Sequence, residues 1–248
     1  MVTIKNNKQL DSMRKAGKIL GDTLKLIEEN AKIGVNTWEL DKLAYEYITS
    51  QGAVPSFLNY DGFPATICAS IDEQVVHGIP SKKIILEEGM LLKIDCGAGL
   101  EGVHTDAART VAIGNVSKEK KQLMDVCKQS FFEGVKVLKE GTRLGDLGFT
   151  IQKYVESFGF GVVRDLVGHG IGETVHEDPN VPNYGIKGRG SRLWKNMTIA
   201  IEPMITLGNY EIEQYNDGWT IATIDKSPSA HYENTVIILS DRAEIITL

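Results

Sequence analysis

Apolar residues in the first fifty positions recur at intervals of three and four. Between residues 8 and 30 these positions are Leu10, Met13, Ile19, Leu20, Leu24 and Ile27. This spacing places them on one face of a helix, which we expect to end before Gly34. A second amphipathic pattern follows. It predicts a helix that has Thr37 as its N-cap and ends at Gly52.

The pattern then changes from helical to extended. Residues 57–68 are rich in aromatics and predict a loop with a short strand, and residues 71–80 predict one strand that ends in a turn. Residues 92–111, LKIDCGAGLEGVHTDAARTV, predict a β-hairpin because Gly99 and Gly102 bracket a short polar tip. Folding this hairpin about its tip places Asp95 opposite Asp106.

The expected hairpin carries a physical cost. Directly opposed side chains on antiparallel strands have Cβ atoms about 5 Å apart, so carboxylates of Asp95 and Asp106 would repel each other. The apolar neighbours on both arms indicate burial, which increases the cost. A cation between the two acids removes it, and the hairpin therefore predicts a metal site. The alternative is a solvated turn with two unrelated acids.

The second half of the chain repeats the order of the first. Helices are predicted over residues 118–139 and 144–158, then a strand-like segment at 162–167 and a strand at 197–204. Residues match at a fixed offset of 107, without a gap over about sixty positions. The matched pairs are Gly34 and Gly141, Leu40 and Leu147, Tyr47 and Tyr154, Gly52 and Gly159, Met90 and Met197, and Ile94 and Ile201.

This repeat predicts an α+β fold of two pseudo-symmetric halves, at about residues 8–115 and 116–248, within one catalytic domain of residues 1–248. Asp95 aligns with Glu202, and Glu233 in HYENTV is the counterpart of Asp106 in HTDAARTV. Because a two-fold fold brings equivalent strands together, we expect all four carboxylates to converge.

Four carboxylates suit two divalent ions better than one. His169 lies between Gly168 and Gly170, and its nitrogen would favour Mn²⁺, Fe²⁺, Co²⁺ or Zn²⁺ over Mg²⁺ or Ca²⁺. His77 and His176 lie in loop segments. Each either hydrogen-bonds a substrate near the ions or stabilises its own loop.

Composition limits the functional classes. The chain has 248 residues, a net charge of −6 and three widely spaced cysteines, Cys68, Cys96 and Cys127. The acidic balance argues against a general nucleic-acid surface, and the cysteines favour a reducing compartment. The N-terminus lacks an apolar signal segment, and no run reaches membrane-spanning length. We expect a cytoplasmic protein without a membrane or specific nucleic-acid site.

The motifs IDCGAGLEGVHTDAART, VGHGIGETVHEDP, AIEPM and HYENTV together resemble the bacterial type I methionine aminopeptidases over almost the whole chain. The resemblance implies the duplicated "pita-bread" fold of creatinases and aminopeptidases, with an antiparallel sheet core and two helices in each half. It implies two divalent ions, Co, Mn, Fe or Zn, on the ligands Asp95, Asp106, His169, Glu202 and Glu233.

The resemblance also implies roles around the ions. His77 would contact the scissile-bond nitrogen, His176 the developing oxyanion, and Glu202 would also shuttle a proton from the attacking water. The implied pocket for the methionine side chain is lined by Phe57, Tyr60, Phe63, Cys68 and Trp219. Two residues depart from the family pattern, Val175 in place of an aromatic and His231 in place of Gln. We expect neither to touch a metal ligand.

The implied activity is removal of N-terminal methionine from nascent proteins when the second residue is small. The implied enzyme is a monomer. Lys118, Lys120 and Lys121 form a basic cluster that either docks at the ribosome or is ordinary solvated surface. The rival with the same fold and ligands is an Xaa-Pro aminopeptidase or prolidase, which usually has a large N-terminal domain. Two alternatives belong to other functional classes. One is a metal-free binding protein on the same fold. The other is a metal-storage site, and this alternative does not explain His77 and His176.

Overall fold

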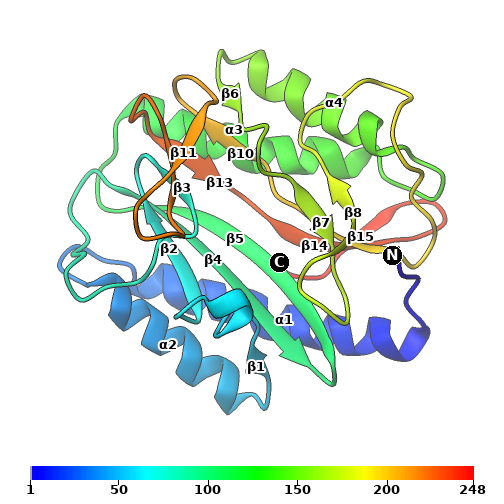
Figure 1. Cartoon of the computed structure of the whole chain (residues 1–248), viewed down its shortest axis with the longest axis horizontal. Coiled ribbons are helices and arrows are strands. Elements are labelled where there is room, and N and C mark those ends of the chain that lie inside the picture. Colours follow the sequence, from blue (N-terminus) through cyan, green and yellow to red (C-terminus); the bar gives the residue numbers. More distant parts are fainter. Residues whose placement is uncertain (1) are drawn as a thin grey trace.

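The computed structural model describes residues 2–248, and this part of the chain contains four α-helices. They are α1 (Asn7–Asn30), α2 (Thr37–Ser50), α3 (Lys118–Lys136) and α4 (Leu144–Glu156). All four predicted helices are confirmed. Figure 1 shows α1 and α2 at one edge of the molecule and α3 and α4 at the other. None of these helices has the length and apolar character needed to cross a membrane.

The start of α2 differs from the prediction by one residue. Asn36 is the N-cap, and its side chain accepts a hydrogen bond from the backbone N–H of Glu39 at 3.0 Å. Thr37 is the first helical residue, and its hydroxyl instead pairs with the backbone of Ser81. Either residue type suits an N-cap, so the tertiary contact with Ser81 decided between them.

The strands of residues 2–248 form four sheets whose pairs are all antiparallel. Those of the first half are β1 (Val54–Pro55), β2 (Ile67–Ile71), β3 (Gln74–Val76), β4 (Leu91–Leu100) and β5 (Val103–Ala112). Those of the second half are β6 (Gly161–Val162), β7 (Gly168–Gly170), β8 (Glu177–Val181), β9 (Thr198–Ile201), β10 (Met204–Thr206), β11 (Ile212–Gln214), β12 (Ile221–Thr223), β13 (Ser229–His231), β14 (Asn234–Ile238) and β15 (Ala243–Ile245). A short 3₁₀ helix, η1 (Tyr60–Gly62), precedes β2.

The central hairpin forms, but its predicted register is wrong by two residues. Leu100 pairs with Val103, so the turn is Glu101–Gly102, and both turn residues have positive φ, 52° and 81°. This is the geometry of the tightest two-residue hairpin turn. Asp95 therefore faces Ala108 and Asp106 faces Gly97. A slip of two residues keeps both acids on one face of the sheet, where they become diagonal neighbours.

Other strands are shorter than predicted. Residues 71–80 contain the end of β2 and the separate β3, because the chain turns at Asp72, which has a φ of 44°. The segment 197–204 is broken at Glu202 and Pro203 into β9 and β10. Residues 162–167 contribute only the last residue of β6. The interruption at Glu202 lies beside the central cavity described below.

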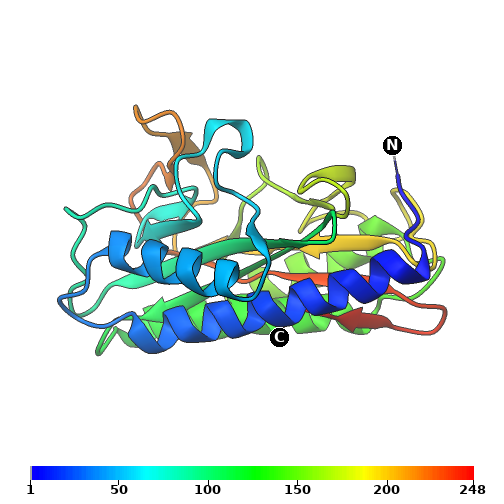
Figure 2. The same ribbon diagram turned by 90° about the horizontal axis from the view of Figure 1, so that it is seen from below.

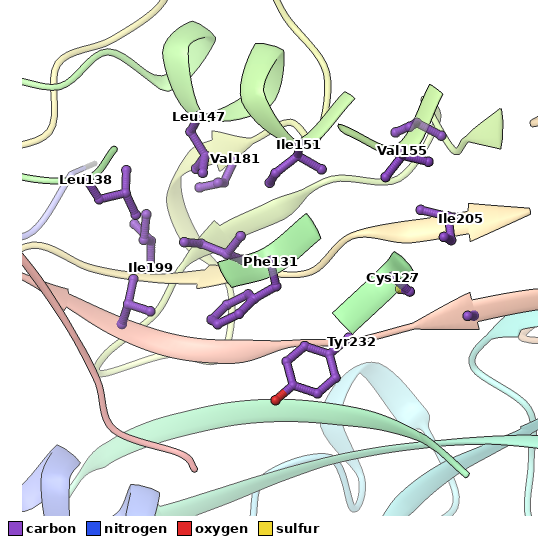
Figure 3. Packing of buried hydrophobic residues seen from close by; sticks show 14 of the residues in the cluster. Cys127, Phe131, Leu138, Leu147, Ile151, Val155, Val181, Ile199, Ile205 and Tyr232 are labelled. Carbon is purple, nitrogen blue, oxygen red and sulfur yellow. The ribbon is translucent and has the colours of Figure 1, made fainter. Parts of the chain in front are cut away.

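Apolar packing between helices and strands holds the halves in shape. Phe131 of α3 and Ile151 of α4 pack over Ile199 of β9 and Ile205 of β10 in one buried cluster (Figure 3). The equivalent cluster of the first half joins α1 and α2 to β2 and β4. Figure 2 shows α1 and α2 on one side of the long hairpin, and η1 and β11 on the opposite side. The architecture agrees with the predicted repeat, because each half contributes two helices and antiparallel strands.

Hydrogen bonds across the middle of the molecule join the two halves. Ala108 on β5 and Glu233 exchange backbone hydrogen bonds in both directions, at 3.0 and 3.3 Å. The hydroxyl of Thr235 likewise accepts from the N–H of Asp106 and donates to its carbonyl. The guanidinium of Arg109 donates to the carbonyl of Glu233 at 2.7 Å. The backbones that carry Asp106 and Glu233 are thus fixed to each other.

Candidate metal centre

A cavity of about 240 Å³ lies where the two halves meet. It contains all five predicted metal ligands, both loop histidines and all five predicted pocket residues. Its lining consists of Phe57, Tyr60, Asp61, Phe63, Cys68, His77, Asp95, Asp106, His169, His176, Glu202, Trp219 and Glu233. The structure therefore brings every predicted site residue to one place, although these residues span much of the chain.

The acids come from strands or from the breaks between strands. Asp95 lies on β4 and Asp106 on β5, on the same face of the hairpin. Glu202 follows β9 directly, and Glu233 lies between β13 and β14. His169 is the middle residue of β7, whose pairing with β9 places it opposite Ala200, two residues before Glu202. The pseudo-two-fold arrangement thus delivers two acids from each half.

His169 is oriented as a nitrogen ligand. Its Nδ1 lies 2.9 Å from the carbonyl of Gly170, which can only accept, so Nδ1 carries the proton and Nε2 holds a lone pair. Nε2 lies 3.7 Å from Asp106 Oδ2 and 3.7 Å from Glu202 Oε1. Burial, followed by the charge of His176, lowers the pKa of His169 to about 4, so the ring is neutral at neutral pH.

The carboxylates are buried without enough partners. Asp95 Oδ1, Asp106 Oδ1 and Glu233 Oε1 are shielded from solvent and lack a hydrogen bond from any residue in the range 2–248. Burial raises the pKa of Asp95 to about 7. It raises the pKa values of Asp106, Glu202 and Glu233 well above the ordinary range, and the charges of neighbouring acids add to this effect. Bound cations would supply the missing partners and stabilise the charged forms.

The donor atoms fit divalent transition ions. Asp106, His169 and Glu233 offer ligand atoms within 4.8 Å of one another. Glu202, His231 and Glu233 form a second such group. The two groups share Glu233, and a mixture of oxygen and nitrogen donors suits Mn²⁺, Fe²⁺, Co²⁺ and Zn²⁺.

His231 is the residue whose position the sequence analysis missed. Its Nε2 lies 3.7 Å from Glu202 Oε2 and 3.8 Å from Glu233 Oε2, so the expectation that it avoids the ligands is wrong. The signal was present in the sequence. His231 precedes Glu233 by two residues, and side chains two apart on an extended strand share a face.

The loop histidines His77 and His176 line the same cavity as the acids. His77 has a φ of 60°, an unusual value for a residue with a side chain. Burial and the charge of His176 lower the pKa of His77 to about 4. His176 Nδ1 lies 3.0 Å from the hydroxyl of Tyr60, and its ring centroid is 4.3 Å from that of His169. Burial also lowers the pKa of His176, so the loop histidines present neutral rings.

An apolar wall adjoins the acids. Phe57, Phe63 and Cys68 are buried in one cluster, against which Tyr60 and Trp219 pack. The rings of Phe63 and Trp219 meet edge to face with centroids 5.1 Å apart. Val175 is also a buried member of this cluster, but it is not among the residues that line the cavity. The cavity thus places an apolar surface beside the cluster of acids and histidines.

Comparisons with known proteins agree with this site. The model of metallopeptidase family M24 matches residues 11–240. A methionine aminopeptidase of Clostridium acetobutylicum is 54% identical over 248 residues, which cover 100% of this chain and 99% of the relative. A methionine aminopeptidase structure from Thermotoga maritima is 40% identical with a TM-score of 0.98, covering 100% of this chain and 99% of that one. A prolidase structure from Pyrococcus furiosus shares the fold with a TM-score of 0.79 and is 22% identical. The match covers 99% of this chain and 65% of the prolidase chain.

Removing the metal should make stability fall as the pH rises from 7 to 9. The four buried carboxyl groups have raised pKa values, so the folded state holds protons that the unfolded state, with ordinary values near 4, has released. Between the unfolded and the folded pKa values the folded state binds more protons than the unfolded state, so the free energy of unfolding decreases as the pH rises until the folded carboxyl groups are deprotonated. The buried histidines have the opposite effect, because their pKa values are lowered in the folded state. They make the free energy of unfolding rise with pH, but only below their unfolded pKa of about 6.5.

The measurement is urea unfolding of chelated protein at pH 7, 8 and 9, with and without added Mn²⁺. Added Mn²⁺ should stabilise the protein more at pH 9 than at pH 7, because it binds deprotonated carboxylates. Asp106→Asn is the matched variant, and it should flatten the dependence on pH. Chelated protein that is equally stable at pH 7 and pH 9 would contradict the expectation.

Proposed function

The chain belongs to metallopeptidase family M24, and we propose that it removes methionine from the N-terminus of peptides by metal-dependent hydrolysis. The observation that carries this proposal is the composition of the central cavity. Five oxygen and nitrogen ligands, two neutral histidines and an apolar wall surround a space of about 240 Å³. Such a space suits one side chain and the peptide bond that follows it.

We assign Asp95, Asp106, His169, Glu202 and Glu233 as ligands of two divalent ions, with Co, Mn, Fe or Zn as the candidate metals. When bound, two such ions polarise a carbonyl group and lower the pKa of a water molecule towards neutrality. The support for this assignment is the set of buried carboxylate oxygens that lack hydrogen-bond partners within residues 2–248.

The residues of the chain then handle the proton and the developing charge. Glu202 takes a proton from the attacking water and delivers it to the leaving amine, since its carboxylate lines the cavity beside both His169 and His231. His77 hydrogen-bonds the scissile-bond nitrogen. His176 donates from Nε2 to the developing oxyanion, which requires Nδ1 to accept, so the hydroxyl of Tyr60 donates to it.

The apolar wall receives the methionine side chain. Phe57, Tyr60, Phe63, Cys68 and Trp219 surround this subsite, and aromatic rings make favourable contacts with a thioether sulfur. Burial and the nearby acids raise the pKa of the Cys68 thiol, which keeps it neutral. The cavity is small, so a bulky second residue of the peptide would compete for space beside the ions. We therefore propose a preference for small second residues.

The proposed substrates are nascent proteins in the cytoplasm, and the proposed active form is a monomer of one catalytic domain. Of the basic cluster that we propose for docking at the ribosome, one lysine is held by other contacts. Lys120 forms an ion pair with Asp72 at 2.6 Å and also donates to the carbonyl of Gly89. Lys118 and Lys121 are exposed at the start of α3 and are the two lysines available for docking.

A peptide assay separates this activity from that of an Xaa-Pro peptidase. The similarity to the prolidase structure supports a shared fold and does not support a shared activity. The protein loaded with Mn²⁺ should cleave Met-Ala-Ser and leave Ala-Pro-Ala intact. Met-Phe-Ser should react far more slowly than Met-Ala-Ser, because its second side chain is bulky. Release of the first residue, followed by chromatography, measures all three. Cleavage of Ala-Pro-Ala alone would refute the proposed activity.

Substitution separates the loop histidines from the ligands. His77→Ala and His176→Ala should retain the metal content of the unaltered protein and lower kcat, by about 10²–10³-fold for the oxyanion donor His176. Asp106→Ala should lose bound metal and activity together. Metal analysis of dialysed protein and steady-state kinetics provide the two readouts. Loss of stoichiometric metal in either histidine variant would show that this histidine is a ligand.

A further inference from the structure

His231 is buried beside the acids, and its imidazole lacks hydrogen-bond partners among the described residues. Its ring is 1% exposed, and neither ring nitrogen has a hydrogen-bond partner within residues 2–248. An imidazole withdrawn from water without partners costs free energy unless another group satisfies it. Thr110 fixes the backbone on both sides, donating to the carbonyl of His231 at 2.8 Å and accepting from its N–H at 2.9 Å. The ring is therefore held at this place by its strand.

The surroundings of His231 match those of His169. Nε2 of His231 lies 3.7 Å from Glu202 Oε2 and 3.8 Å from Glu233 Oε2. Nε2 of His169 lies 3.7 Å from one oxygen each of Asp106 and Glu202. Such distances exceed a hydrogen bond, which ends at about 3.2 Å. They are close to the separation of about 3–3.5 Å between ligand atoms that each lie about 2.0–2.2 Å from one ion.

We propose that His231 is a second nitrogen ligand of the ion pair, which makes this inference rest on the function proposed above. His231 shares one ion with Glu202 and Glu233, and His169 shares the other with Asp106 and Glu233. Glu202 stands between the imidazoles, because its Oε1 faces His169 and its Oε2 faces His231. Each ion then has one nitrogen ligand, so both positions discriminate against Mg²⁺ and Ca²⁺.

Proton NMR of the Co²⁺-loaded protein tests the proposal without an activity assay. An imidazole bound to Co²⁺ through one nitrogen shows a strongly shifted, solvent-exchangeable signal from the N–H of the other. The unaltered protein should show two such signals. His231→Gln, which keeps a polar side chain, should lose one, and His169→Gln should lose the other. His104→Gln is the control, because His104 bonds Ser56 outside the ion site, and it should keep both.

Titration with Mn²⁺ gives a second readout, and His231→Gln should weaken one of two binding events at least about tenfold. The inference would be overturned if the unaltered protein, with two Co²⁺ bound, showed a single shifted signal that His169→Gln abolishes and His231→Gln retains. That result would leave the proposed function intact. It would mean that His231 donates to the carboxylates instead. Failure of the unaltered protein to bind Co²⁺ would overturn the proposed function as well. The signal count in the unaltered protein decides the matter even if His231→Gln does not fold.

Discussion

Repulsion between buried carboxylates is the constraint on which the structure depends. Asp95, Asp106, Glu202 and Glu233 meet in an interior where water does not screen their charges, and burial raises the pKa of each. Such a cluster persists only if the surrounding scaffold is rigid and the charge is compensated. The reciprocal hydrogen bonds between Ala108 and Glu233 provide the rigidity, and bound divalent ions would provide the compensation.

The same arrangement explains why the fold is duplicated. Each half presents a helix pair on one side and strands on the other, and neither half alone contains more than two of the four acids (Figure 1). The site is complete only where β5 meets the segment between β13 and β14. The strand breaks at Glu202 and at Glu233 release side chains towards the cavity, while the helices bury the opposite faces of the sheets. An apolar subsite and an ion site therefore lie side by side.

The sequence predicted the helices, the central hairpin and the convergence of both halves, because periodicity and an internal repeat survive without tertiary information. It missed details that tertiary contacts decide. The positive φ of Glu101 moved the hairpin turn by one residue, and hence the register by two. Ser81 drew Thr37 away from the capping role. His231 was judged by its departure from a family pattern, although its two-residue spacing from Glu233 placed it on the ion-facing side.

The most direct test of the central claim is anomalous X-ray scattering from crystals soaked in Mn²⁺. If the buried acids exist to hold two ions, the anomalous map should show two peaks about 3.5–4 Å apart within the cavity bounded by Asp95, Asp106, His169, Glu202 and Glu233. Peaks confined to the protein surface, at Mn²⁺ concentrations that support peptide cleavage, would contradict the account.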